Sequence, residues 1–325
     1  MPMFTLPDLE AAVALVRTVV PPTPFYAWPL LAARTGAQVW VKHENHTPIG
    51  AFKVRGGIVY LEALKGIGAK LNGVVTATRG NHGQSIALAA ASAGVACAIF
   101  VPRGNSREKN RAMRAFGAEL ISAGADFDES RDHAGRFSAE RGYHYVPSFH
   151  ADLVKGVATY ALEMFTARPD LDCVYVPIGM GSGICGLITV RDLLGLDTEI
   201  VGVVAENAPA VALSFAEGRP VPTNSAATFA DGMACRVPHE AALAILRRGA
   251  ARIVRVGEDE IAQAMRAIWE DTHNVAEGAG AAALAALLKE RERMCGKRVG
   301  LVLSGGNIDR EVLAQVLAGR TPAVA

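Results

Sequence analysis

The chain has 325 residues, of which half are hydrophobic, and its formal net charge is +1. This composition predicts a sizeable core in one large or two ordinary domains. A nucleic-acid partner is not expected, because the basic residues are scattered rather than clustered.

The cysteines are odd in number, far apart and without a CxxC pair: Cys97, Cys173, Cys185, Cys235 and Cys295. They favour a reduced, cytoplasmic setting over a disulfide framework or a zinc knuckle. No basic run precedes an apolar segment at the N-terminus, so we expect no signal peptide. The most apolar stretch, 86–101, is interrupted by Ser92 and Gly94 and predicts helix, turn and strand rather than a membrane span.

The first predicted element is a helix over 7–20 with Thr5 as its cap, which three prolines end. A strand over 38–44 follows. From Val74 onward, β-branched apolar runs alternate with alanine-rich amphipathic segments. The predicted strands span 74–77, 96–101, 119–122, 143–146, 173–178, 199–205, 253–256 and 298–303. One predicted helix starts near Ile86 and ends at Ser92, another begins at Asp152, and another ends at Leu194. The other predicted helices span 107–116, 127–141, 210–217, 259–272, 280–291 and 310–317.

Apolar strands joined by helices of this length predict parallel sheets that are covered on both faces. The segment 218–238 is expected to be irregular. No low-complexity linker separates two halves of the chain. If there are two domains, the chain is therefore expected to pass between them more than once.

The segment 51–57 places one lysine, Lys53, between Phe52 and Val54 and ahead of two glycines. Apolar neighbours are expected to desolvate its amine, which lowers the pKa of a lysine and makes the amine a usable nucleophile or base. A lysine that forms Schiff bases needs such surroundings. The alternative is a lysine at a helix start whose stem covers apolar surface while its amine reaches solvent.

Three glycine-containing loops follow predicted strands, where ligands bind in open α/β sheets. The loop 78–84 (TRGNHGQ) precedes a helix, and its backbone N–H groups suit an anion such as a carboxylate. The loop 179–183 (GMGSG) predicts a phosphate cradle and is not a Walker loop. Its GxGxxG spacing leaves a dinucleotide site as an alternative, although Glu206 comes slightly late for one. The loop 304–307 (SGGN) is compatible with an ordinary turn or with a site.

Together and in this order, these four segments resemble the fold type II pyridoxal-phosphate enzymes, and within them the threonine/serine dehydratase and serine racemase group. The resemblance runs from about Pro21 to Asn307. It rests on Phe52-Lys53-x-Arg55-Gly56, on Gly80-Asn81-His82-Gly83-Gln84, on the glycine loop at Gly179 and on Ser304-Gly305-Gly306-Asn307.

The resemblance implies a role for each matching residue. Lys53 would hold pyridoxal 5'-phosphate as a Schiff base and act as the base, and Ser304 would face the pyridine nitrogen. The cofactor would also be bound by Phe52, Asn81, Gly179, Met180, Gly181, Ser182 and Gly183. The substrate, through its carboxylate, would be bound by Thr78, Arg79, Gly80, Asn81 and His82. Cysteine-synthase relatives carry Thr at the position of His82, so the dehydratase side is favoured.

The chain departs from the family pattern at several positions. Ala51 replaces a common Ser, and Met180 and Ser182 replace two of the four usual glycines. Arg79 stands where racemases carry a serine. The racemase metal site would need an acidic residue at position 212, where this chain has Ala212, so we expect no metal.

The resemblance implies an α/β fold of two open, twisted, mainly parallel sheets with helices on both faces and the cofactor in the cleft between them. Residues 1–72 and 151–325 would form a large cofactor-binding domain, and residues 73–150 a small substrate-carboxylate domain. The implied partners are a small amino-acid substrate and, as a possibility, a second copy of the chain, with no nucleic acid and no membrane.

The implied reaction is β-elimination of a 3-hydroxy amino acid such as L-threonine or L-serine to a 2-oxo acid and ammonia. Two alternatives share the scaffold: a serine racemase, and a dehydratase specific for 3-hydroxyaspartate or phenylserine. Two others come from different classes: a Rossmann-type oxidoreductase, which would depend on a nicotinamide cofactor, and a non-catalytic amino-acid or cofactor-binding protein, which would not need Lys53.

Overall fold

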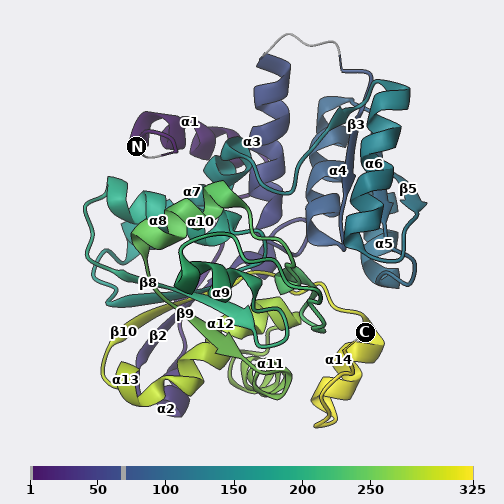
Figure 1. Cartoon of the computed structure of the whole chain (residues 1–325). Coiled ribbons are helices and arrows are strands. Elements are labelled where there is room, and N and C mark those ends of the chain that lie inside the picture. The colour runs from purple at the N-terminus through teal and green to yellow at the C-terminus, as the bar shows by residue number, and fades with distance from the viewer. Residues whose placement is uncertain (1–2, 67–70, 325) are drawn as a thin grey trace.

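The computed structural model describes residues 3–66 and 71–324, and its strands form two sheets (Figure 1). The larger sheet has the order β1-β2-β10-β7-β8-β9, in which only the β1–β2 pair is antiparallel. The smaller sheet, β5-β4-β3-β6, is parallel throughout. The fold class expected from the sequence is confirmed. The strands are β1 (Phe25–Ala27), β2 (Gln38–His43), β3 (Val74–Ala77), β4 (Cys97–Val101), β5 (Glu119–Ser122), β6 (His144–Tyr145), β7 (Cys173–Pro177), β8 (Glu199–Ala205), β9 (Ala250–Val256) and β10 (Arg298–Leu303).

Helices connect nearly all the strands, as parallel pairing requires. They are α1 (Leu6–Val16), α2 (Pro29–Thr35), α3 (Lys53–Gly66), α4 (Asn81–Ala93), α5 (Arg107–Ala115), α6 (Phe127–Arg141), α7 (Ala151–Ala167), α8 (Ser182–Leu193), α9 (Ala210–Glu217), α10 (Glu240–Gly249), α11 (Glu258–Thr272), α12 (Gly278–Lys289), α13 (Arg291–Met294) and α14 (Arg310–Leu317), with short 3-10 turns η1 (Glu44–His46) and η2 (Asp231–Met233).

Successive residues of the central strands point to opposite faces of the larger sheet, and both faces are buried. On β7, Tyr175 belongs to the core formed with α11 and α12, whereas Val174 and Val176 belong to the core formed with α7 and α8. The same alternation divides the smaller sheet. Its Val74 packs with α3 and α4, and Val75 packs with α6. Each sheet is therefore a middle layer between helices, which explains its uninterrupted apolar strands.

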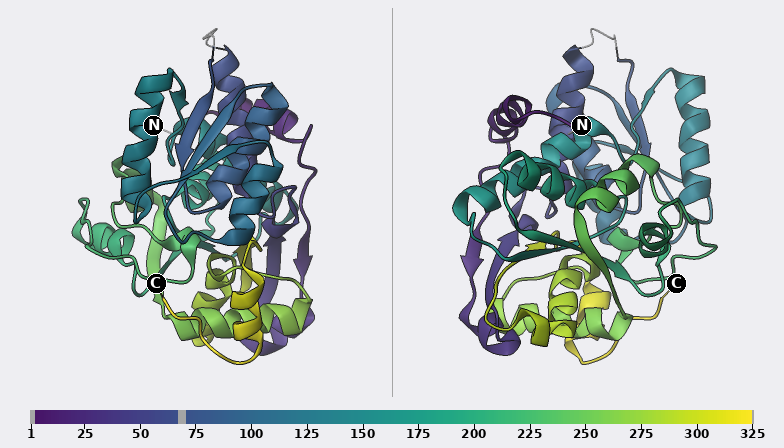
Figure 2. Two further views of the ribbon diagram at one scale, coloured as in Figure 1. Left: turned by 90° about the vertical axis from the view of Figure 1, so that its right-hand side faces the viewer. Right: turned by 60° about the vertical axis from the view of Figure 1, so that its left-hand side comes forward.

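The smaller sheet and its helices lie in the upper part of the molecule, and the larger sheet lies below (Figures 1 and 2). All strands of the smaller sheet fall within 73–150, and all strands of the larger sheet fall outside that range. This arrangement supports the division into two domains, which stays a prediction.

Some elements differ from the expectation. The first helix ends at Val16 rather than at residue 20, and α2 and α10 were not anticipated. The helix α3 was expected only as an alternative, as a helix start at Lys53, and it contains Gly56 and Gly57 although glycines are poor helix formers. Its glycines serve packing instead: a Cβ on Gly56 would lie 2.8 Å from the Leu153 carbonyl oxygen, and one on Gly57 would collide with Ser85.

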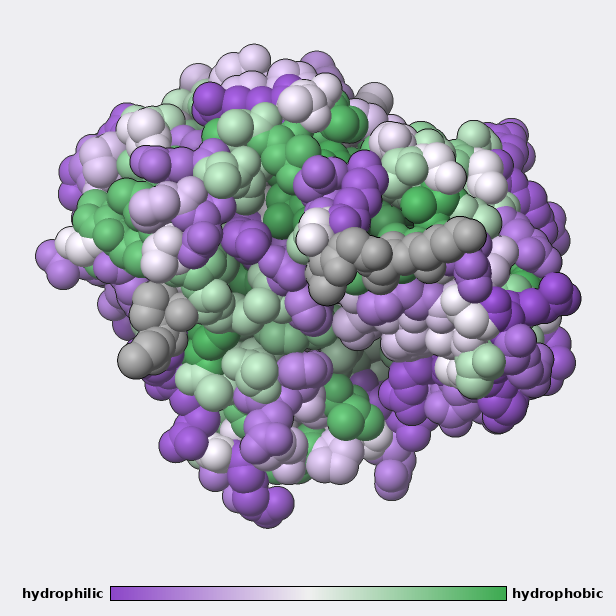
Figure 3. Space-filling model, turned by 90° about the horizontal axis from the view of Figure 1, so that it is seen from above, coloured by the Kyte–Doolittle hydropathy of each residue, from purple (hydrophilic) through white to green (hydrophobic). Residues whose placement is uncertain are grey.

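The surface seen from above mixes hydrophilic and hydrophobic side chains, with hydrophilic ones prevailing at the periphery (Figure 3). Within the described ranges, no helix has both the length and the apolar character that a membrane crossing needs.

Candidate active site

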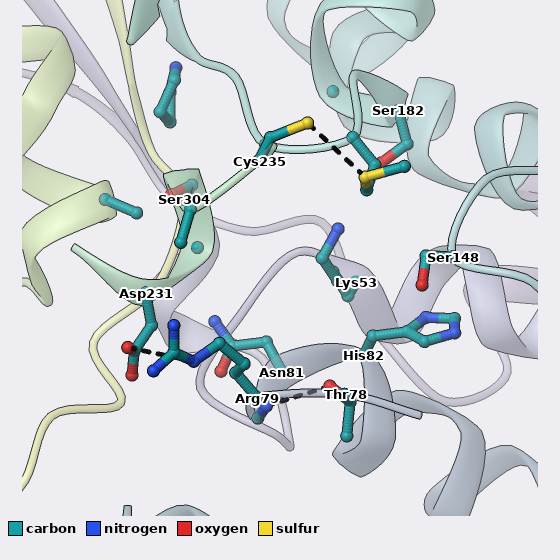
Figure 4. Close-up of a pocket in the computed structure, with 18 of the residues that line it drawn as sticks. Lys53, Thr78, Arg79, Asn81, His82, Ser148, Ser182, Asp231, Cys235 and Ser304 are labelled. Carbon is teal, nitrogen blue, oxygen red and sulfur yellow. Dashed lines mark hydrogen bonds and ion pairs between the residues drawn. The ribbon is translucent and has the colours of Figure 1, made fainter. Parts of the chain in front are cut away.

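The ends of three parallel strands and the start of α3 meet at one cleft (Figure 4). The loops that follow β3, β7 and β10 all lie on the carboxyl side of their strands, which is where open α/β sheets bind ligands. The cleft brings together every residue that the sequence singled out for the site: Phe52, Lys53, Thr78, Arg79, Gly80, Asn81, His82, Gly179, Met180, Gly181, Ser182, Gly183 and Ser304. Their individual roles stay predictions.

Lys53 is the first residue of α3, and its amine is desolvated, as its neighbours in the sequence suggested. Its Nζ lies 4.6 Å from the centre of the Phe52 ring. Burial lowers the pKa of Lys53 to about 8, although the nearby carboxylate of Glu277 opposes the shift. A substantial fraction of the amine is therefore neutral near physiological pH, which a nucleophile or a base requires.

Backbone and side-chain contacts fix the position of Lys53 from two sides. The Phe52 N–H donates to the Ser304 carbonyl oxygen at 3.1 Å, so the loop after β10 holds the segment before the lysine. The Ser85 hydroxyl of α4 donates to the Lys53 carbonyl oxygen at 2.6 Å. The loop after β10 and the helix α4 thus both fix the backbone that carries Lys53.

A buried ionic network lies under the first turn of α3. Arg55 is fully buried and donates to Glu44 at 2.8 and 3.0 Å and to Glu163 at 2.8 and 3.0 Å. Lys42 also pairs with Glu163, so two cations face two anions. This network links β2, η1, α3 and α7, and it accounts for Arg55 in the lysine motif.

The loop 179–183 has the properties of a phosphate cradle. Gly181 adopts φ 98°, a left-handed conformation that favours glycine, and caps the N-terminus of α8. A Cβ on Gly179 would collide with the Gly232 carbonyl oxygen, so the chain leaves this space to the backbone alone. The first N–H groups of a helix have no partner within it, and its dipole favours an anion there.

The loop from Thr78 to His82 joins β3 to α4. The Gly80 and Gly83 N–H groups donate to the Thr78 hydroxyl at 2.9 and 3.3 Å, which shapes the loop. His82 is buried, and burial together with the charge of Lys53 lowers the pKa of its imidazole to about 3. The imidazole is therefore neutral, and an anion at this loop would be bound by the N-terminus of α4 rather than by a histidine cation.

Sequence reasoning missed three charged residues that line the cleft: Lys109, Asp231 and Glu277. Glu277 accepts hydrogen bonds from Asn81 Nδ2 at 2.5 Å and from Lys109 Nζ at 3.1 Å. Lys109 Nζ also lies 3.2 Å from Asp231. The sequence carries a weak signal for Glu277 alone, because a single carboxylate precedes the fully apolar first turns of α12. Lys109 lies in a highly charged helix, where it resembles a solvent-facing lysine.

Arg79 reaches across the cleft toward the larger sheet. Its Nε lies 3.8 Å from Asp231 Oδ1, and Figure 4 shows the two side chains facing each other. The Arg79 side chain remains 38% exposed. The residue thus both lines the cleft and pairs with an acidic partner.

The family described as "Pyridoxal-phosphate dependent enzyme" matches residues 16–305 of the chain. The chain belongs to this family. Its cofactor is therefore pyridoxal 5'-phosphate, and the alternatives of a dinucleotide site and of a non-catalytic protein are set aside. The residues present fit this cofactor, because a desolvated lysine and a glycine loop at a helix N-terminus, with no room for a side chain at Gly179, face the same cleft.

Several relatives of this pyridoxal-phosphate enzyme are similar over nearly the whole chain. An L-threonine ammonia-lyase from Thermotoga maritima is 34% identical over 316 residues, which cover 97% of this chain and 78% of the relative. An L-threo-3-hydroxyaspartate ammonia-lyase from Saccharomyces cerevisiae is 31% identical, covering 97% of each chain. Among solved structures, a serine racemase from maize superposes with a TM-score of 0.89 at 26% identity and covers 97% of each chain.

Proposed function

We propose that this enzyme eliminates water from a 3-hydroxy amino acid, with L-threonine and L-serine as its substrates, and that hydrolysis of the resulting enamine gives a 2-oxo acid and ammonia. The observation that carries the proposal is the position of the desolvated Lys53 amine in one cleft with the glycine loop after β7 and the Thr78–His82 loop. The similarity to the L-threonine ammonia-lyase from Thermotoga maritima supports the same reaction.

Each part of the proposed site has its own role in the reaction. The N-terminus of α8 binds the phosphate of the cofactor, and the N-terminus of α4 binds the substrate carboxylate. When bound, the cofactor would withdraw electrons from the substrate Cα. Lys53 would hold the cofactor in the resting enzyme and, once free, would accept the Cα proton through its neutral amine. The β-hydroxyl would leave as water with a proton that balances the one Lys53 takes from Cα, and the enamine released would hydrolyse to a 2-oxo acid and ammonia.

Ser304 and Asn81 tune and orient the cofactor in this proposal. Asn81 is well placed for this role because Glu277 accepts from its Nδ2 and Asn307 donates to its Oδ1 at 2.9 Å, which fixes the amide. Its second amide hydrogen is free to meet the phenolic oxygen. Ser304, which is 4% exposed, offers a neutral hydroxyl to the pyridine nitrogen. A neutral partner favours loss of a β-leaving group over transamination.

A serine racemase is the runner-up, since the maize serine racemase shares the fold. A racemase needs a second acid–base group on the opposite face of the cofactor. Arg79 occupies the position where racemases carry the serine, and a guanidinium group stays charged and transfers protons poorly at neutral pH. We therefore propose elimination rather than racemisation.

Two further features remain predictions of this proposal. The cysteines of the chain are unpaired, with four buried and Cys295 exposed, which supports a reducing, cytoplasmic location. A homodimer is also retained as a prediction.

The experiment that tests the proposal is the fate of L-serine. The purified protein is loaded with pyridoxal phosphate and incubated with L-serine, and the products are separated by chiral chromatography. We expect pyruvate and ammonia in equal amounts and almost no D-serine. Substantial D-serine would identify the racemase, and the absence of both products would contradict the proposed reaction.

A further inference from the structure

Four charged side chains lie in the cleft apart from Lys53, and they alternate in sign. Arg79 and Lys109 come from the part of the chain that carries the smaller sheet, and Asp231 and Glu277 come from the part that carries the larger sheet. The ion pairs among them are Arg79–Asp231, Lys109–Asp231 and Lys109–Glu277. The four charges sum to zero.

The pairs are not equally tight, and this difference shows which cation a ligand can reach. Lys109 is 7% exposed and lies 3.1 Å from Glu277 and 3.2 Å from Asp231, so its charge is fully occupied. Arg79 is 38% exposed, and its Nε lies 3.8 Å from Asp231. Arg79 is therefore the cation of this group that is accessible to a second carboxylate of a substrate.

Asp231 decides whether Arg79 can take such a carboxylate. It belongs to the turn η2, is 28% exposed, and faces Arg79 within the cleft (Figure 4). An anionic side chain of a substrate that approached the Arg79 fork would meet the like charge of Asp231 at the same place. A neutral hydroxyalkyl side chain meets no such repulsion.

We propose that Asp231 is a specificity-determining residue: by neutralising Arg79 it disfavours substrates with a second carboxylate, such as 3-hydroxyaspartate, and keeps the enzyme selective for neutral 3-hydroxy amino acids. This inference rests on the proposed elimination reaction. In this inference the Arg79–Asp231 pair determines the substrate class. The similarity to both a threonine ammonia-lyase and a 3-hydroxyaspartate ammonia-lyase leaves that class open.

The substitution Asp231→Asn isolates the charge with little risk to the fold. Lys109 keeps Glu277 at 3.1 Å, so no buried cation loses its last partner. Arg79 keeps contact with solvent. Asparagine has nearly the size of aspartate and retains the ability to accept a hydrogen bond.

The experiment compares kcat/KM for threo-3-hydroxyaspartate and for L-threonine in the wild-type holoenzyme and in four variants. These are Asp231→Asn, Arg79→Ala, the double variant and a control at Asp170. We expect Asp231→Asn to raise the ratio of kcat/KM for threo-3-hydroxyaspartate to kcat/KM for L-threonine about tenfold, which corresponds to about 1.4 kcal/mol. Adding Arg79→Ala to Asp231→Asn should abolish this gain. Arg79→Ala alone should leave the ratio unchanged within about twofold, since Asp231 already cancels the charge.

A matched control and a binding measurement complete the test. Asp170→Asn removes a surface carboxylate that pairs with Arg168 and Arg298, and it should leave the ratio unchanged. Titration of each holoenzyme with L-aspartate, followed by the visible absorbance of the cofactor, should show tighter binding only in Asp231→Asn.

Three results would overturn the inference. The wild-type enzyme could prefer the dicarboxylate, Arg79→Ala alone could selectively lower kcat/KM for the dicarboxylate, or Asp231→Asn could leave the ratio of the two kcat/KM values unchanged. If the wild-type enzyme forms a 2-oxo acid from neither substrate, it is the proposed function that fails. If the wild-type enzyme forms a 2-oxo acid from threonine but Asp231→Asn does not change the ratio of kcat/KM values, the inference fails while the proposed reaction stands.

Discussion

The pKa of one side chain, Lys53, controls both cofactor attachment and proton abstraction in the proposed reaction. Burial lowers this pKa, and the carboxylate of Glu277 limits the decrease. The same Glu277 fixes the amide of Asn81 and neutralises Lys109. One buried carboxylate therefore acts on Lys53, the proposed base, on Asn81, the proposed cofactor-orienting amide, and on Lys109.

The lowered pKa of Lys53 predicts the pH dependence of cofactor attachment. The neutral amine is the nucleophile, and its fraction rises with pH through a pKa of about 8, below the value near 10.4 of an unperturbed lysine. The rate at which cofactor-free protein regains visible absorbance with pyridoxal phosphate should therefore rise with a midpoint near pH 8. Stopped-flow absorbance measures it. In Glu277→Gln the midpoint should fall further, and a wild-type midpoint near pH 10 would contradict the assignment.

At the scale of single elements, the proposed phosphate site requires the loop before α8 to leave room for the backbone to approach an anion. A Cβ on Gly179 would collide with the Gly232 carbonyl oxygen, whereas a Cβ on Gly135 in α6 would meet open space. A side chain therefore fits at Gly135, within α6, but not at Gly179, which precedes α8.

Gly179→Ala should weaken cofactor binding about tenfold or more, because overpacking costs about 1–3 kcal/mol and displaces the loop. The dissociation constant of pyridoxal phosphate, measured by absorbance titration of cofactor-free protein, gives the effect. The control Gly135→Ala should leave this constant unchanged and stabilise the fold by about 0.5–1 kcal/mol. Equal cofactor affinity in both variants would remove the loop from the phosphate site.

The network under the first turn of α3 makes a second prediction at this scale. Arg55→Ala should lower the free energy of unfolding by about 3–5 kcal/mol, because it leaves Glu44 and Glu163 as buried, partly uncompensated charges. Urea denaturation measures the loss. Arg131→Ala, which removes an exposed pair with Asp128, should change it by less than about 0.5 kcal/mol. A small loss at Arg55 would show that the network does not hold α3.

At the scale of the whole molecule, the strand pattern predicted the fold well because both sheets are buried on both faces. Strands β3, β5, β8 and β10 have the bounds that their apolar runs indicated. The loops of the site were also found, since glycine and polar residues after a buried strand are conspicuous. The length of α3 was not predicted, because its glycines, which are poor helix formers, allow close packing against Leu153 and Ser85.

The charged part of the cleft could not be predicted from the sequence. Lys109 is separated from Asp231 and Glu277 by more than one hundred residues, and the pairing depends on how the two sheets face each other. Asp231 lies in a segment that the sequence presented only as irregular. Ion pairs between distant elements carry no local pattern, so the residues inferred to set specificity appear only in the folded molecule.

The most direct test of the central claim is the formation of 2-oxobutanoate from L-threonine by the wild-type holoenzyme and by Lys53→Ala. Because Lys53 serves as both anchor and base, the variant should lose the visible absorbance of the bound cofactor and all turnover, while its unfolding temperature stays near that of the cofactor-free wild type. Formation of 2-oxobutanoate at the wild-type rate by Lys53→Ala would contradict the account.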